Sequence, residues 1–315
     1  MRAWRYDAFG PVSAMARLVE ASQPRPGRGQ VLVRVHYASI NPLDWKLVEG
    51  EYKLIAKSKP PAGIGTEFSG VVEAIGSGVA APAIGTPVVS YIDPMVRPPG
   101  VLQEHVAVDA SVALPIDAAD LPLACTLPVA GMSALQMCRL GDVKSGHRVL
   151  VHGAAGGVGS FAVQVVRALG GRPVATGSRL SQAFLDELEP EAKVDYTSQR
   201  IDNWGGPFNV VLDCASTLGS SEVAVLLANG GAYVRTLPSF PSLLLDPLVN
   251  PLRPVKRHTL RLKPNADDLR TLLTWMKRGR IRPQVTERFS FANAARALEA
   301  SRSGKARGKL VVQLA

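Results

Sequence analysis

Just past its midpoint the chain reads Arg148-Val149-Leu150-Val151-His152-Gly153-Ala154-Ala155-Gly156-Gly157-Val158-Gly159, and a helical pattern follows from Ser160 to Leu169. A β-branched strand, a glycine-rich turn and a helix in this order predict the opening of a dinucleotide-binding unit. Residues without bulky side chains let the backbone turn tightly and let a pyrophosphate approach the N–H groups at the start of the helix. Ala154, Gly156 and Gly159 fill the three positions of the Gly-x-Gly-x-x-Gly pattern, with alanine at the first. The predicted cofactor contacts in this turn are Ala155, Gly156, Gly157 and Val158.

The segments around this turn alternate between strand and helix patterns. Strands are expected at 149–152, 173–176, 194–196, 210–213 and 232–236, and helices at 121–140, 160–169, 182–188 and 220–227. Strands separated by helices of this length predict a parallel, doubly wound sheet. Before residue 115, short alternating apolar runs broken by Gly and Pro predict a β-rich, barrel-like domain instead. The predicted fold class is therefore α/β, with a doubly wound parallel sheet and a second, β-rich domain.

The composition, with 46% hydrophobic and 20% charged residues among 315, is typical of a globular protein. No apolar run reaches the roughly 18 residues that span a bilayer, and the first residues lead into polar sequence rather than a signal-peptide core. We therefore expect a cytoplasmic protein without a membrane partner. Its cysteines, Cys125, Cys138 and Cys214, lack the paired spacing of a zinc or disulfide framework, which indicates buried apolar side chains.

The formal net charge of +10 makes nucleic acid a partner to consider. Basic residues are spread along the chain, and the denser stretch from Arg253 to Lys263 lacks the interleaved aromatic side chains that stack on bases. A solvated face, together with attraction for an anionic cofactor, accounts for such a charge. We do not expect a nucleic acid partner.

Five short motifs occur in an order that resembles a known family. They are Asn41-Pro42-Leu43-Asp44-Trp45-Lys46, Gly65-Thr66-Glu67-Phe68-Ser69-Gly70-Val71-Val72, Leu127-Pro128-Val129-Ala130-Gly131-Met132-Ser133-Ala134, the glycine turn, and Gly308-Lys309-Leu310-Val311-Val312. Together they resemble the zinc-independent medium-chain dehydrogenase/reductases of the quinone oxidoreductase type, over nearly the whole chain. The resemblance implies a bilobal enzyme with a GroES-like catalytic domain, a Rossmann domain and a cofactor in the cleft. It implies a catalytic domain from residues 1–118 and 265–315, with the NADP-binding Rossmann domain at 119–264.

The same motifs bear on metal chemistry. The zinc-dependent relatives of this family carry a Cys in the first motif, a His in the second and a Cys in the third, and they also have a lobe with four Cys. Here the first motif has no Cys, Thr66 stands in place of the His, and the third motif has no Cys, although Cys125 lies just upstream. A catalytic zinc needs three protein ligands and a structural zinc four, so we predict no metal site. Without a metal ion, the carbonyl group must be polarised by hydrogen bonds. This suits conjugated acceptors better than simple alcohols, because the charge that develops on a conjugated acceptor is delocalised.

The residues after the second strand of the dinucleotide unit bear on the choice of cofactor. An acidic residue about 20 positions past the glycines binds the ribose 2′-OH of NAD, whereas a basic residue there accommodates the 2′-phosphate of NADP. The chain has Ser178 and Arg179 at this point, with no acid before Asp186. By resemblance Tyr196 would lie against the same end. The sequence therefore favours NADPH, the alternative being that Arg179 only ends a strand in solvent.

The resemblance also implies that further residues contact the nicotinamide end of the cofactor. Asn41 and Ser133 match family positions that contact it, and Cys214 and Leu237, after the fourth and fifth strands, should line its pocket. Lys309 in the terminal Gly-Lys pair either reaches the cofactor or caps an edge strand.

Tyr52 matches a tyrosine that is often found at the substrate mouth of the family. A phenol there could hydrogen-bond the acceptor oxygen or supply a proton, although a packing aromatic is the alternative. Tyr52 and Asn41 are the candidate catalytic residues, while Asp44 and Glu67 are expected to be structural.

The sequence thus predicts an NADPH-dependent oxidoreductase that transfers hydride to a quinone or an α,β-unsaturated carbonyl. Two alternatives stay open: an enoyl or enone reductase of the same family, and an NADPH-binding sensor or structural protein with little turnover. We expect a homodimer, with a hydrophobic contact in the Leu- and Pro-rich segment from Leu237 to Pro254.

Overall fold

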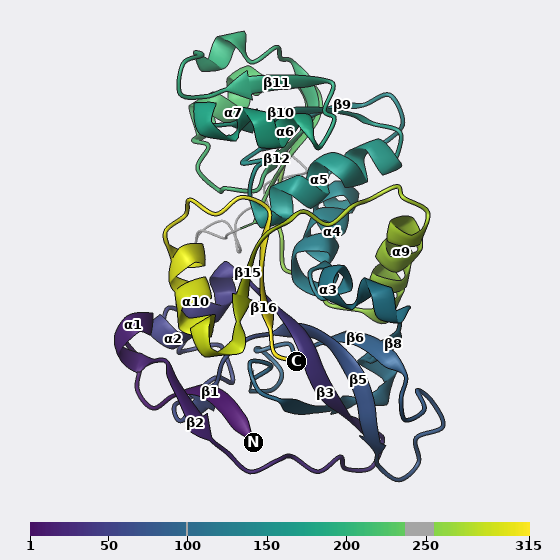
Figure 1. Ribbon diagram of the computed structural model, residues 1–315. Helices are drawn as coiled ribbons and strands as arrows, with labels where there is room; N and C mark the ends of the chain where they lie inside the picture. The colour runs from purple at the N-terminus through teal and green to yellow at the C-terminus, as the bar shows by residue number, and fades with distance from the viewer. Residues whose placement is uncertain (99, 237–254) are drawn as a thin grey trace. The chain divides into compact units, whose positions relative to one another are not determined.

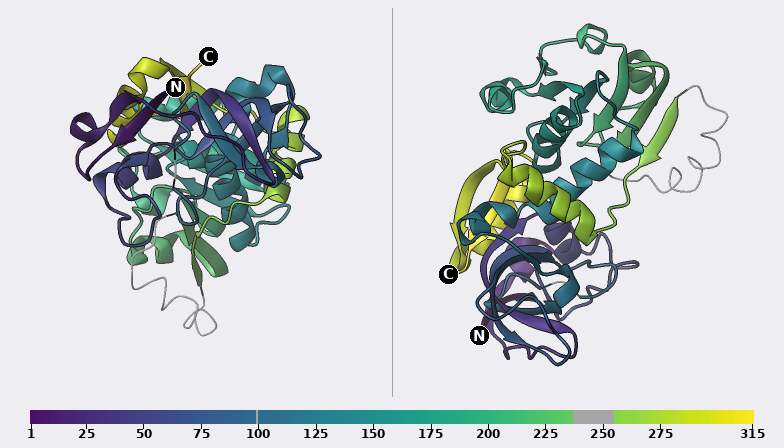
Figure 2. Two further views of the ribbon diagram at one scale, coloured as in Figure 1. Left: turned by 90° about the horizontal axis from the view of Figure 1, so that it is seen from below. Right: turned by 90° about the vertical axis from the view of Figure 1, so that its right-hand side faces the viewer.

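The computed structural model describes residues 1–98, 100–236 and 255–315 of the chain. The chain divides into two compact units. The first contains Met1–Val129, Pro264–Leu273 and Pro283–Ala315, and the second contains Ala130–Lys263 and Thr274–Arg282. Both chain ends therefore belong to the first unit (Figure 2).

The second unit is built on a six-stranded parallel sheet in the order β11-β10-β9-β12-β13-β14 (Figure 1). Its strands are β9 (Arg148–His152), β10 (Arg172–Gly177), β11 (Ala192–Asp195), β12 (Phe208–Asp213), β13 (Leu227–Arg235) and β14 (Lys256–Thr259). Counted within the unit, this order is 3-2-1-4-5-6, which is that of doubly wound dinucleotide-binding sheets. The strand order reverses between β9 and β12, so a ligand crevice is expected at the carboxyl end of β9.

Helices connect these strands and pack on them. They are α4 (Met132–Leu140), α5 (Gly157–Ala168), α6 (Gln182–Asp186) and α7 (Ser220–Leu226). The helix α5 packs on β9 and β10, and α7 packs on β12 and β13. The core under α7 contains fully buried side chains of three adjacent strands, among them Leu150, Val174 and Phe208. The predicted α/β fold with a doubly wound parallel sheet is confirmed.

The first unit is rich in strands, as predicted. One sheet has the order β15-β16-β3-β5-β6-β8 with β7 also paired to β3, and a smaller sheet has the order β2-β1-β4. Their strands are β1 (Arg2–Tyr6), β2 (Arg17–Glu20), β3 (Gln30–Ile40), β4 (Ala62–Gly63), β5 (Glu67–Ile75), β6 (Pro87–Tyr91), β7 (His105–Asp109), β8 (Leu114–Pro115), β15 (Val285–Ser290) and β16 (Lys309–Gln313). The strand β16 lies between β15 and β3, so the last part of the chain completes a sheet begun near its start.

The unit also contains the helices α1 (Val12–Met15), α2 (Pro42–Glu49), α3 (Leu121–Ala124) and α10 (Ala294–Arg302). The helix α9 (Ala266–Lys277) is divided between the two units, since the first ends at Leu273 and the second resumes at Thr274. The apolar core of the first unit joins Val33 and Val35 of β3 to Phe68 of β5 and to Leu298 of α10. The Trp4 side chain donates its Nε1–H to the Phe291 carbonyl oxygen at 2.8 Å and so ties the two ends of the chain together.

The predicted helix over 121–140 is interrupted. The chain forms α3, then a π-helical turn at Leu127–Gly131, and then α4. Pro128 lies inside the interruption and has no N–H to donate to a preceding carbonyl group, which accounts for the break in a continuous helix. Among the described residues no single helix has the length and apolar character to cross a bilayer, and one bent pair, Ala118–Ala124 with Leu127–Leu140, meets those two criteria.

Candidate cofactor and catalytic sites

The glycine turn after β9 is shaped by close contacts within the second unit. Gly153 has a positive φ of 73°, and a Cβ at this position would lie 3.0 Å from the Ala215 Cβ. A Cβ on Gly159 would lie 2.2 Å from the Gly153 carbonyl oxygen. These two positions therefore require glycine for the turn to close and for α5 to pack on it.

Gly156 differs from its neighbours because the protein itself does not require glycine there. Its φ of −78° and ψ of 174° suit any residue, and the nearest atom to an added Cβ is the Gly153 oxygen at 3.5 Å, an ordinary contact. The space above Gly156 is thus open. Gly157 and Val158 begin α5, whose first N–H groups have no partner within the helix. Together with Ala155 on the same turn, these residues fit the diphosphate of a dinucleotide.

A buried histidine, which we did not predict as a site residue, fixes the strand ends beneath this turn. His152 Nδ1 lies 2.8 Å from the Thr176 hydroxyl oxygen, and Nε2 lies 2.9 Å from that of Thr217. The imidazole stacks on Trp204 with ring centroids 5.6 Å apart, and burial lowers the pKa of His152. The side chain therefore joins β9, β10 and the loop after β12 as a neutral ring. The sequence did contain a signal for His152: it is a polar residue at the end of an apolar strand, directly before the glycines.

The predicted 2′-phosphate residues lie together at the carboxyl ends of β10 and β11. The hydroxyl oxygens of Ser178 and Ser181 are 2.9 Å apart, and the side chain of Arg179 is exposed. Tyr196 donates its backbone N–H to the Gly177 carbonyl oxygen at 3.2 Å, so it lies against the end of β10 as the resemblance implied.

An unpredicted carboxylate also reaches this end. Asp195 is the last residue of β11 and accepts hydrogen bonds from the Thr197 hydroxyl and backbone N–H groups. These hydrogen bonds, with a contribution from the Arg179 guanidinium, lower the pKa of Asp195. The Arg179 guanidinium therefore lies close enough to Asp195 for the two charges to interact.

The other predicted cofactor contacts in the second unit have separate positions. Ser133 is buried in the first turn of α4. Cys214 follows β12 and donates its backbone N–H to the His152 carbonyl oxygen at 3.0 Å, while burial raises the pKa of its thiol. Leu237 and the expected dimer segment up to Pro254 lie outside the described residues.

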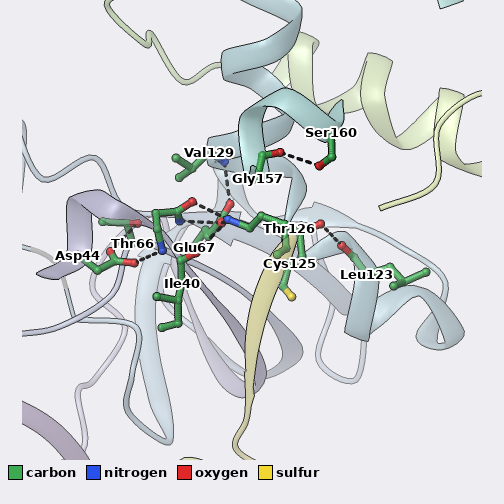
Figure 3. A network of polar contacts seen from close by, with 12 residues as sticks. Ile40, Asp44, Thr66, Glu67, Leu123, Cys125, Thr126, Val129, Gly157 and Ser160 are labelled. Carbon is green, nitrogen blue, oxygen red and sulfur yellow. Dashed lines mark hydrogen bonds and ion pairs between the residues drawn. The ribbon is translucent and has the colours of Figure 1, made fainter. Parts of the chain in front are cut away.

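The first unit contains a buried network that joins Asn41, Glu67 and Lys309. Figure 3 shows Glu67 within this network, with Ile40 and Val129 nearby. The Asn41 Nδ2 group donates to Glu67 Oε1 at 2.7 Å. The Lys309 ammonium donates to Asn41 Oδ1 at 2.6 Å, to Glu67 Oε1 at 3.0 Å and to the Ile40 carbonyl oxygen at 3.1 Å. The second Glu67 oxygen accepts the Val129 N–H at 2.7 Å. The structure thus brings together the predicted residues Asn41 and Lys309 from opposite ends of the chain.

A second carboxyl group fixes Asn41 from the other side. Asp44 Oδ2 accepts the Asn41 backbone N–H at 2.7 Å, which closes the first turn of α2, and Asp44 Oδ1 accepts the Thr66 hydroxyl at 3.0 Å. Burial raises the pKa of Asp44 to about 7. Asp44 and Glu67 therefore hold the backbone and side chain of Asn41 in place. The alternative in which Lys309 caps an edge strand is wrong, because β16 is an interior strand.

Tyr52 lies outside this network. It is half-buried in the turn that follows α2, where its carbonyl oxygen accepts the Ala56 N–H at 2.9 Å. Its phenol makes no hydrogen bond to any residue that the structure describes.

The described residues also contain no cluster of metal ligands. Within residues 1–98, 100–236 and 255–315, no group of three or more His, Cys, Asp or Glu side chains could hold a metal ion.

Comparisons with known proteins agree with this architecture. Residues 27–118 match the alcohol dehydrogenase GroES-like domain, and residues 190–312 match the zinc-binding dehydrogenase domain. A chloroplastic quinone oxidoreductase of Triphysaria versicolor is 29% identical over 99% of this chain and 98% of its own length. A chloroplastic NADPH-dependent alkenal/one oxidoreductase of Arabidopsis thaliana is 28% identical over 99% of this chain and 79% of its own length.

A solved structure covers the whole chain. The cobalt- and zinc-bound thermostable alcohol dehydrogenase of Pyrobaculum aerophilum is 30% identical, with a TM-score of 0.84 over 100% of this chain and 99% of that one. The chain belongs to the medium-chain dehydrogenase/reductase family. It is an oxidoreductase that uses a nicotinamide cofactor.

Proposed function

We propose that this chain is an NADPH-dependent reductase that works without zinc and transfers hydride to a quinone or an α,β-unsaturated carbonyl. The observation that carries the proposal is the buried network of Asn41, Glu67 and Lys309 in the first unit. Zinc-dependent relatives are expected to carry metal ligands in the first two of the five motifs. In these motifs this chain has the Asn41 amide and the Thr66 hydroxyl group. The buried charge of Glu67 is neutralised by an ammonium group 3.0 Å away.

The preference for NADPH is supported by the end of β10. Ser178 and Arg179 offer a hydroxyl donor and an exposed guanidinium, and a phosphate pairs well with both. NAD-selective sites bind the ribose 2′-OH through an acid about 20 positions past the glycines, and this chain has Ser178 and Arg179 there instead.

The acceptor class is supported by the chemistry of the first unit and by the names of two relatives, a quinone oxidoreductase and an alkenal/one oxidoreductase. When bound, NADPH supplies the hydride. The protein must then orient the acceptor and stabilise an enolate or hydroquinonate oxygen by hydrogen bonds. Asn41 has one Nδ2 hydrogen beyond the one that it gives to Glu67, and it serves as a donor at this point. Solvent or the Tyr52 phenol supplies the proton.

The test is a turnover assay with the purified protein. We expect repeated loss of the NADPH absorbance with a panel of quinones and enones, and no formation of NADPH from NADP with saturated primary alcohols. Alcohol oxidation requires stabilisation of an alkoxide, for which a metal ion is the usual means. Comparison of kcat/KM across the panel decides between quinone and enone acceptors. Binding of NADPH with no turnover on any acceptor would instead identify a sensor or structural protein.

A further inference from the structure

The orientation of the Asn41 side chain is fixed by the chemistry of its two neighbours. An ammonium group can only donate hydrogen bonds, so the atom 2.6 Å from Lys309 Nζ must be the amide oxygen. An ionised carboxylate can only accept, so the atom 2.7 Å from Glu67 Oε1 must be the amide nitrogen. The amide thus lies between a cation and an anion, and only one of its two orientations satisfies both.

The network uses almost every donor and acceptor that it contains. Lys309 directs its three hydrogens to Ile40, Asn41 and Glu67. Its side chain is 2% exposed and that of Glu67 is 0% exposed, so neither charge is solvated by water. Among the described residues, no acceptor is bonded to the second Nδ2 hydrogen of Asn41. One buried amide N–H is therefore left for a ligand.

We propose that Lys309 is a positioning residue, whose ammonium group holds the Asn41 amide so that this N–H is presented to the carbonyl oxygen of the acceptor or of the nicotinamide. A cation on Oδ1 also withdraws electron density from the amide and makes its N–H a stronger donor. The inference rests on the proposed function for the identity of that ligand. The proposed positioning role differs from a purely structural role, in which Lys309 would only neutralise the charge of Glu67.

A pair of variants separates these two roles. Lys309→Met removes the charge and leaves Glu67 unpaired, so we expect a lower melting temperature and a turnover that falls roughly a hundredfold. Glu67→Gln combined with Lys309→Met removes both charges, and we expect the melting temperature to recover. The amide introduced at position 67 can offer one oxygen, which the Val129 N–H requires, so its nitrogen faces Asn41 and favours the reversed Asn41 amide. Turnover of the double variant should stay at least tenfold below that of the wild type. NADPH affinity should stay within about twofold if the ligand of this N–H is the acceptor, and should fall if the ligand is the nicotinamide.

The exposed Lys305, four residues earlier, provides the matched control, because Lys305→Met removes a lysine outside the network. We expect wild-type turnover and melting temperature for this variant. If the double variant recovers full turnover along with its stability, Lys309 only neutralises Glu67 and the proposal is wrong.

A second readout requires no substrate. In ¹⁵N–¹H spectra the Asn41 side-chain NH₂ signals, assigned by their loss in Asn41→Ala, should form one sharp pair in the wild type. In the double variant they should shift, broaden or double, since the reversed amide orientation becomes accessible. Identical signals in the two proteins would overturn the proposal even if no acceptor is reduced. Absence of turnover in the wild type, with the expected change in these signals, would count against the proposed function alone.

Discussion

At the scale of single residues, Asp44 couples the stability of the first unit to pH. Its carboxyl group is fully buried, and burial raises its pKa from 3.8 to about 7. Between about pH 4 and pH 7 the unfolded chain loses this proton while the folded chain keeps it. The folded state then binds more protons, so the contribution of Asp44 to the free energy of unfolding decreases as the pH rises through this range. Below pH 4 that contribution is fully present.

We expect Asp44→Asn to remove this part of the pH dependence. The wild-type free energy of unfolding should fall with pH by up to about 1.4 kcal/mol per unit from this group, and the variant should show a slope shallower by that amount. Urea denaturation at a series of pH values from 4 to 8 measures both slopes. Asp142→Asn is a suitable control, because Asp142 is an exposed carboxylate that pairs with Lys144. Equal slopes in Asp44→Asn and wild type would show that Asp44 titrates normally.

We propose that Arg179 recognises the 2′-phosphate of NADPH. We expect NADPH to bind at least tenfold more tightly than NADH, a difference of about 1.4 kcal/mol that one charge-assisted contact can supply. Arg179→Ala should bring the two dissociation constants within about threefold of each other, as measured by calorimetry. Arg200→Ala, at an exposed arginine paired with Asp202, should leave the preference unchanged. Equal affinities of the wild type for both cofactors would overturn the assignment of NADPH.

At the scale of elements, two glycines of the same turn have different tasks. A Cβ on Gly159 would collide with the Gly153 oxygen at 2.2 Å, so Gly159→Ala should lower the free energy of unfolding by about 1–3 kcal/mol. A Cβ on Gly156 makes only a 3.5 Å contact, so Gly156→Ala should fold nearly as stably as the wild type. Its methyl group would occupy the space left for the diphosphate, and we expect NADPH affinity to fall at least tenfold.

Thermal unfolding and NADPH titration of the two variants test this division. A Gly156→Ala protein with wild-type affinity for NADPH would show that the diphosphate binds elsewhere.

The sequence predicted this turn well because its requirements are local: strand, glycines and helix lie within about 20 consecutive residues. The break at Leu127–Gly131 was missed because apolar helical spacing continues across it, and the effect of Pro128 on the hydrogen bonds is not visible in that spacing.

At the scale of the whole molecule, the two kinds of domain could be predicted but the buried network could not. Alternating strand and helix patterns identify a parallel sheet, since each pattern is read from neighbouring residues. The partners Asn41 and Lys309 are 268 positions apart and meet because β16 pairs with β3, with Leu310 opposite Ile40. Periodicity carries no information on that pairing. The motif resemblance pointed to both residues as cofactor contacts, but the ion pair with Glu67 emerged only from the structure.

The metal content of the whole protein follows from the same network. We expect less than about 0.1 zinc per chain by elemental analysis, and no change in melting temperature or turnover after treatment with a chelator. Glu67 already has a cation, the Lys309 ammonium, and Thr66 gives its hydroxyl to Asp44. A sample dialysed against zinc and then against buffer serves as the control for weak surface binding. One tightly held metal ion per chain, with activity lost on its removal, would show that this enzyme uses the metal chemistry of its zinc-binding relatives instead of hydrogen bonds alone.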